Sequence, residues 1–312
     1  MLHTSTALVL AMVLGAPIPK QKPKSEYIGY YVCCKESNVQ TYRLRADQVF
    51  VPDEEPSYLR YIDVRVVDEK EQYVAVQADS EVIWLKKSDV LKAKDAVDHF
   101  LKVLETEKND QRAVAVICWA YMAIHDYDNA LKFANRCVEL SPNSIAWKNN
   151  RGEVYNKRKE YSKAIEEFTS ILNKSPTYFF ALYNRSEAYM RTGKFQEALD
   201  DINNALENHA DVPGLFVNQA RVLSIASDAK LRDGKKAIEI ARKAGEVLKF
   251  KDGYYFDTLA AAYAEVGDFE KAVDLQTKAM ADPDWMKREE KEIRLRLDLY
   301  RNKKPYHFSI QK

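Results

Sequence analysis

The sequence has few of the residues that usually build chemical sites. Of 312 residues, only 9 are glycine, 5 histidine and 4 cysteine. The histidines are scattered without the spacing of metal ligands, and no glycine-rich stretch has the form of a phosphate-binding loop. Paired carboxylates such as Glu166-Glu167 have lysine or arginine nearby, which indicates solvated helix faces. We therefore expect no enzyme activity, no metal site and no cofactor.

The sequence also lacks an excess of charge of either sign. Lysine and arginine number 48 and aspartate and glutamate 47, so the formal net charge is +1. Proteins that bind nucleic acid usually concentrate positive charge, and the overall composition shows no such excess. We therefore expect no nucleic-acid partner. With 46% apolar and 30% charged residues, the composition is that of a soluble globular or repeat protein.

Long hydrophobic runs are missing as well. The apolar run Ala7–Ala16 is too short to cross a bilayer, but it has the length of the apolar part of a signal peptide. We expect residues 1–24 to be a signal peptide and linker, and the protein to be exported to the periplasm or cell envelope. No integral membrane segment is expected after signal removal. The alternative is an uncleaved leader or a misassigned start, because no lysine or arginine precedes the run and Pro17 follows it; the protein would then be cytoplasmic.

Residues 25–91 have the composition of a small all-β domain. Aromatic and β-branched stretches recur at short spacing and predict strands over 27–34, 41–51, 61–67, 72–78 and 81–85. Polar loops are expected at 68–71 and 79–80. Several short strands separated by such turns favour a small barrel or sandwich.

Three side chains of this domain carry further expectations. Trp84 is expected in the core rather than on a binding surface. Cys33 and Cys34 are adjacent in a predicted strand, so their side chains point to opposite faces and one should be buried. Residues 82–90, a tryptophan-containing strand followed by a polar turn and a valine, resemble the end of bacterial Src-homology-3-like barrels.

A period of 34 residues organises the remainder of the chain. It is carried by Ala96, Ala130, Ala164 and Ala198. An aromatic residue stands three positions before each of the last three alanines, a tyrosine stands nine before, and Pro142 and Pro176 follow two of them by twelve. Such a pattern predicts helix–turn–helix repeats, which stack into a solenoid because one helix pair cannot bury its apolar face alone.

The period gives the boundaries of the expected α-solenoid at 92–302. A single helix at 92–107 should precede repeats at 111–144, 145–178, 179–212, 213–250 and 253–286, followed by a capping helix at 287–302 and a tail at 303–312. In the fourth repeat Ala237 comes five residues late, which predicts a loop at 227–234.

The repeats resemble the tetratricopeptide-repeat family, with its first-helix aromatic, tight turn, second-helix alanine and closing proline. Residues 232–280 and 295–308 resemble the C-terminal region of planctomycete bacterial members of this family, which often carry an N-terminal barrel. The resemblance implies a mainly α fold, an α-solenoid preceded by a small β domain, and a scaffold for protein–protein interaction.

The period also maps the residues that should line the concave groove of the repeats. They are Trp119, Asn149, Asn150, Glu153, Tyr183, Asn184, Glu187, Asn218 and Arg221. Asn150, Asn184 and Asn218 keep the 34-residue spacing, and their amides are suited to hold the backbone of an extended peptide. The alternative is that they are scaffold residues that recur with the repeat. The expected partner is a protein or peptide; the alternative function is a cell-envelope module whose β domain binds wall peptide.

Overall fold

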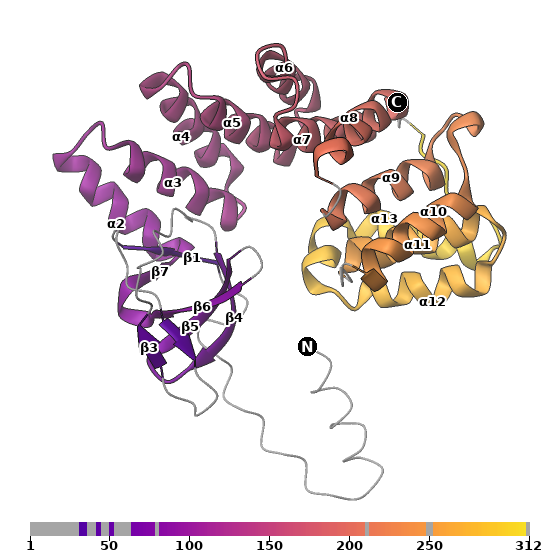
Figure 1. Cartoon of the computed structure of the whole chain (residues 1–312), viewed down its shortest axis with the longest axis horizontal. Coiled ribbons are helices and arrows are strands. Elements are labelled where there is room, and N and C mark those ends of the chain that lie inside the picture. The colour runs from indigo at the N-terminus through magenta and orange to yellow at the C-terminus, as the bar shows by residue number, and fades with distance from the viewer. Residues whose placement is uncertain are drawn as a thin grey trace, which may run out of the picture. The chain divides into compact units, whose positions relative to one another are not determined.

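The computed structural model describes residues 31–35, 42–44, 50–52, 64–78, 81–209, 212–247 and 252–309. These form two compact units, one up to Asp126 and one from Tyr127 onward, and each is described separately below. The elements are labelled in Figure 1. The predicted signal peptide and linker at 1–24 lie outside the described residues.

The first unit contains an antiparallel sheet. Its described strands are β1 (Tyr31–Cys34), β2 (Tyr42–Leu44), β3 (Phe50–Pro52), β4 (Val64–Lys70), β5 (Tyr73–Ala78), β6 (Glu81–Lys86) and β7 (Val90–Lys92). They run in the order β3-β2-β6-β5-β4-β1-β7. The sequence therefore correctly predicted a small β region before the helices, and its described strands lie between Tyr31 and Lys92.

Two details of the strand prediction are wrong. The single strand expected at 41–51 is a pair, because β2 and β3 are antiparallel with Leu44 opposite Phe50. The polar residues expected as a loop at 68–71 mostly belong to β4, and the turn falls on Glu71 and Gln72. Polar side chains on the exposed side of a strand look like a loop when only composition is considered. The loop predicted at 79–80 lies outside the described residues.

The core of the sheet is apolar on both faces. Trp84 is 6% exposed and packs with Tyr73 and Phe50, which confirms that it is a core residue. Cys34 is buried on the opposite face, where burial raises the pKa of its thiol to about 11. The side chain of Cys33 is outside the described set.

Two helices complete the first unit: α2 (Ala93–Thr106) and α3 (Gln111–Ala123). Helix α2 was predicted at 92–107 and is confirmed. Asp110 caps α3 by accepting hydrogen bonds from the backbone N–H groups of residues 112 and 113. The guanidinium of Arg112 donates to the carbonyl oxygens of Cys34 and Lys35, both at 3.0 Å, and so joins α3 to the end of β1.

The second unit is helical throughout its described part. Its α-helices are α4 (Tyr127–Leu140), α5 (Ile145–Lys157), α6 (Tyr161–Leu172), α7 (Phe179–Arg191), α8 (Phe195–Asn208), α9 (Pro213–Ile225), α10 (Gly234–Arg242), α11 (Gly253–Glu265), α12 (Phe269–Met280) and α13 (Pro283–Arg301). Each helix packs on the next, and α5, α7, α9, α11 and α13 also contact one another in series. These helices form the predicted solenoid from the second helix of the first repeat onward, whereas α2 and α3, which were expected to open the solenoid, belong to the first unit.

The alanines that set the period are fully buried between packed helices. Ala130, Ala164, Ala198, Ala237 and Ala272 each have 0% exposed surface, one in the second helix of every repeat. A larger side chain would push the two helices of a repeat apart, so the small residue is required by packing. The structure thus confirms that the period reflects helix packing.

Ion pairs recur with the same period inside two helix pairs. Arg151 of α5 bonds to Glu167 of α6, and Arg185 of α7 donates two hydrogen bonds, of 2.8 and 2.7 Å, to Asp201 of α8. Each arginine stands 16 residues before its partner. The repeat signal in the sequence therefore includes a charged pair as well as alanines and aromatics.

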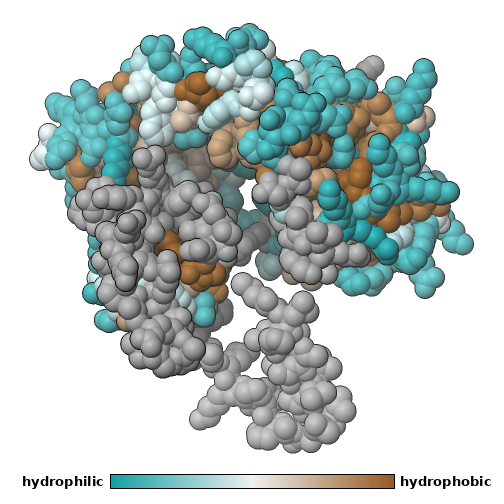
Figure 2. Space-filling view, viewed as in Figure 1, coloured by the Kyte–Doolittle hydropathy of each residue, from teal (hydrophilic) through white to brown (hydrophobic). Residues whose placement is uncertain are grey.

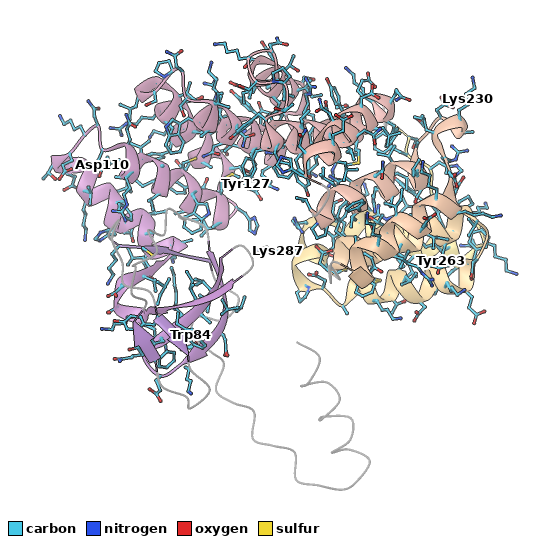
Figure 3. All side chains as sticks on the ribbon, viewed as in Figure 1. Trp84, Asp110, Tyr127, Lys230, Tyr263 and Lys287 are labelled. Carbon is cyan, nitrogen blue, oxygen red and sulfur yellow. The ribbon has the colours of Figure 1, made fainter. Side chains whose placement is uncertain are left out.

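The irregular fourth repeat has the predicted loop between α9 and α10. Its only regular piece among the described residues is a short 3-10 helix, Ala229–Leu231. The guanidinium of Arg232 donates to the carbonyl oxygens of Ala226 and Ser227 and to the carboxylate of Glu265 on α11. Lys230 stands near the tip of this loop in Figure 3. The insertion is thus held at its base.

The C-terminal end of the chain caps the solenoid. Ile293, Leu297 and Tyr300 are buried, which confirms the predicted apolar stripe of the capping helix. Beyond α13 the tail returns to earlier repeats: the Phe308 backbone N–H donates to the Ile225 carbonyl at 2.8 Å, and its ring meets that of Phe195 edge-on.

The described surface is mixed in polarity. Figure 2 shows hydrophilic residues over much of the outer helices, with hydrophobic residues in separate areas between them. The described helices include none that combines the length and apolar character needed to cross a bilayer.

Candidate functional site

The first helices of the second, third and fourth repeats present a common stripe of residues. Asn150, Glu153 and Lys157 lie at spacings of three and four on α5, which places them on one side of the helix. The matching residues on the next helices are Asn184, Glu187 and Arg191 of α7 and Asn218 and Arg221 of α9. We call these residues the first-helix face.

The predicted groove residues differ widely in accessibility. Asn150 is exposed, and Glu153, Tyr183, Asn184 and Glu187 are half-buried. Asn149, Asn218 and Arg221 are buried, at 6%, 3% and 8% exposed. Trp119 belongs to the first unit, where it is half-buried on α3. The accessible part of the first-helix face is therefore concentrated on α5 and α7.

The asparagines spaced by 34 residues do not bond to one another in a single ladder. The side-chain amide of Asn184 donates to the side chain of Asn149 at 3.5 Å, and the backbone carbonyl of Asn184 accepts from the side chain of Asn156 at 2.9 Å. The Asn218 side chain accepts from the hydroxyl of Tyr254 at 2.9 Å. These amides join neighbouring first helices. Among the three, Asn150 is the exposed one.

A buried ionic cluster lies where α9, α11, α12 and α13 meet. The Asp257 carboxylate, with no exposed surface, accepts hydrogen bonds from Arg221, Gln276 and Arg296. Burial disfavours its charge, but the two guanidinium groups outweigh that effect and hold the pKa of Asp257 below its usual range. Arg221 also lies over the ring of Tyr254. As placed, this cluster keeps Arg221 away from solvent.

A second ion pair joins α7 to α13. The two terminal nitrogens of Arg191 donate to the Glu289 carboxylate at 3.2 and 2.6 Å, across 98 residues of sequence. Burial opposes ionisation of Glu289, yet Arg191 and, beyond it, Arg221 and Arg296 lower the pKa of this carboxyl group. The helix departs from helical geometry at Glu289, where φ is −135° and ψ is 23°.

These two clusters contain the residues that sequence reasoning missed. They are Asp257, Gln276, Arg296 and Glu289, on helices α11, α12 and α13 at the end of the array. The period gave Arg191 a position matching Lys157, so its place on the first-helix face could be found from the sequence. Its partner could not, because α13 carries eleven charged residues with no preferred register.

The pKa shifts predict how acid affects this region. A carboxyl group whose pKa is lower in the folded state adds stability above its unfolded pKa, about 4.3 for glutamate, and this stability is lost as the pH falls through the folded value. We expect the difference in unfolding free energy between wild type and Glu289→Gln to be constant from pH 8 to 5 and to shrink below about pH 4.3. Urea denaturation across this range measures it, and a difference that grows on acidification would contradict the assignment.

The described residues hold no cluster of three or more histidine, cysteine, aspartate or glutamate side chains that suits a metal ion. The accessible chemistry of the first-helix face consists of amides, carboxylates and a guanidinium, which are groups that bind peptide backbones and charged side chains.

Comparison with known proteins identifies the repeats. Residues 116–144 and 179–209 each match a family model described as tetratricopeptide repeat. The Hsp70-Hsp90 organizing protein 3 of Arabidopsis thaliana is 29% identical over 82 residues, which are 26% of this chain and 15% of that protein. The chain therefore matches a small part of this curated relative.

Solved structures show the same fold at low identity. A tetratricopeptide repeat protein from Parabacteroides merdae gives a TM-score of 0.54 at 15% identity, covering 67% of this chain and 78% of that one. The type IV pilus biogenesis factor PilW gives 0.52 at 17% identity, with 61% and 85% covered. Cut9, in its complex with Hcn1, gives 0.57 at 11% identity, with 67% and 39% covered. The helical part of this chain therefore has the fold of tetratricopeptide-repeat solenoids, and two of its repeats match the family models directly.

Proposed function

We propose that the protein is a non-catalytic scaffold that binds a protein or peptide partner on the first-helix face. The observation that supports this most directly is the accessible polar stripe on α5 and α7, where Asn150 is exposed and Glu153, Asn184 and Glu187 are half-buried. Solenoids use their extended concave surfaces for binding. Buried Asn218 and Arg221 contribute by fixing α9 and α11 behind this surface.

The alternative function, recognition of wall peptide by the β domain, receives no support from the described strands. Trp84, the aromatic side chain best suited to a binding platform, is buried in the sheet. The likeness of residues 82–90 to Src-homology-3-like barrels and the export of the protein both stay proposals.

Site-specific photocrosslinking in the full chain tests the proposal. A benzophenone amino acid replaces Asn150 on the first-helix face or, as a matched control, Glu166 on the exposed side of α6. We expect a partner adduct from position 150 and none from position 166. A partner that crosslinks equally from both positions, or only from position 166, would contradict binding on this face.

Substitution measures the contribution of the stripe. Changing Asn150 and Glu153 together to alanine removes one exposed and one half-buried polar side chain from the first-helix face. Because a net hydrogen bond contributes about 1 kcal/mol, we expect affinity for the crosslinked partner to fall roughly fivefold to thirtyfold. Unchanged affinity in a binding titration would show that the partner does not bind at these residues. Glu166→Ala is the control and should have no effect.

A further inference from the structure

Helix α13 consists of two pieces with different roles. Glu289, whose backbone is not helical, separates residues 283–288 from 290–301. The second piece buries Ile293 and Leu297 and forms the cap on α11 and α12. We call residues 283–289 the lead segment, which Lys287 marks in Figure 3. Trp285 of the lead segment nevertheless shares a buried cluster with Ile293 of the cap and Ala279 of α12, so the two pieces of α13 pack in one core.

The lead segment lies on the first-helix face of the later repeats. Its Glu289 carboxylate takes both hydrogen bonds of the Arg191 guanidinium on α7. Its Trp285 ring packs against Tyr254 at a centroid distance of 5.2 Å. Tyr254 in turn bonds to Asn218 and lies under Arg221, both on α9. Through one acid and one aromatic ring, the lead segment thus contacts α7 and α11 directly, and it is linked to α9 only through Tyr254.

The chemistry of this contact is complementary. Arg191 is the cation that the lead segment contacts, because Arg221 is buried and already paired with Asp257. Glu289 supplies the carboxylate, and Arg191 is the main group that lowers the pKa of this buried acid, with a smaller effect from Arg221. A two-bond guanidinium–carboxylate pair is specific for a planar anion. The Trp285 ring is 5% exposed, yet its indole N–H has no acceptor among the described residues. The indole N–H of Trp285 is therefore a buried donor without a hydrogen bond, and release of the lead segment would expose this N–H to water.

We propose that the lead segment is an internal occupant of the partner site, and that the external partner is a peptide segment with an acidic side chain one helical turn from a large aromatic one. This inference rests on the proposed function of the first-helix face. The partner exchanges with residues 283–289 at Arg191 and Tyr254, so the lead segment closes the part of the face between α7 and α11 and leaves Asn150 on α5 accessible. Its apparent affinity is the intrinsic affinity reduced by the fraction of molecules in which the lead segment is released.

The probe for the test is a labelled peptide with the sequence of residues 282–292, Asp-Pro-Asp-Trp-Met-Lys-Arg-Glu-Glu-Lys-Glu, added to the full chain. Glu289→Gln in the chain removes the internal carboxylate with little change in shape, so the peptide should bind this variant about tenfold more tightly than wild type. A peptide with glutamine at the position of Glu289 should bind the Glu289→Gln chain with about tenfold lower affinity than the unmodified peptide does. Arg191→Met in the chain should remove the difference between the two peptides.

Two controls keep the result interpretable. Glu290→Gln changes the adjacent exposed acid, which pairs with Arg294, and should leave peptide affinity at the wild-type value. Hydrogen exchange of residues 283–288 should be faster in Glu289→Gln than in wild type, and faster in wild type when peptide is added. Equal peptide affinity for wild type and Glu289→Gln, or equal exchange in both, overturns the inference. Crosslinking from position 150 reports a partner on α5 independently of α13, so failure here is distinguishable from failure of the proposed function.

Discussion

Replacing Asp257 by asparagine is expected to lower the free energy of unfolding by about 3–5 kcal/mol, because it removes the counter-charge of two buried arginines. Arg221 and Arg296 both bond to this carboxylate, and they are 8% and 2% exposed. Asparagine keeps the volume and one acceptor but no negative charge. Both guanidinium groups would then sit in a poorly solvated site without compensation.

Urea denaturation followed by circular dichroism measures this effect. The matched control is Asp274→Asn on the outside of α12, where an exposed carboxylate pairs with Lys278 four residues later. This control is expected to change the free energy of unfolding by less than about 0.5 kcal/mol, as for most exposed ion pairs. If the two substitutions cost the same, the cluster around Asp257 does not hold the last repeats together as described.

Replacing Phe168 by alanine is expected to lower the free energy of unfolding by about 3–5 kcal/mol. Its ring has no exposed surface and fills the space beside Gly152, the glycine of the preceding helix α5. A Cβ added at Gly152 would lie 2.5 Å from a ring carbon, so Gly152→Ala forces the ring to move and should cost about 1–3 kcal/mol.

The double substitution decides whether these two residues are coupled. In the Phe168→Ala background the space opposite Gly152 is empty, so Gly152→Ala should cost less than alone, or even recover stability. A double-mutant cycle from chemical denaturation gives the coupling, expected in the range of about 1–3 kcal/mol. If the two effects are additive, contact with the Phe168 ring is not the reason that glycine is required at position 152.

The fold was largely predictable because small-residue packing repeats with the helices. Every alanine of the period is fully buried, and even the late Ala237 correctly located the loop that Arg232 holds. The sequence predicted that this region forms β-strands, but it did not predict which strands pair. The 41–51 stretch alternates through β2 and β3, and alternation alone does not show where a chain reverses.

The candidate site was predictable only in part. Spacing placed Asn150, Asn184 and Asn218 at matching positions, but accessibility depends on neighbouring helices. Tyr254 covers Asn218, whereas Asn150 has open surface. Long-range partners such as Arg191 and Glu289 lie 98 residues apart and leave no periodic signal, since one of them belongs to a helix outside the repeats.

The returning tail bears on how the protein is made. A linear array can fold repeat by repeat as the chain emerges during synthesis, since each repeat contacts only its neighbours. Here Phe308 packs against Phe195 and His307 bonds to Glu265, so α8 and α11 gain their last contacts only after translation has passed residue 308. A ribosome stalled before that point would carry a third repeat whose Phe195 ring lacks its aromatic cover.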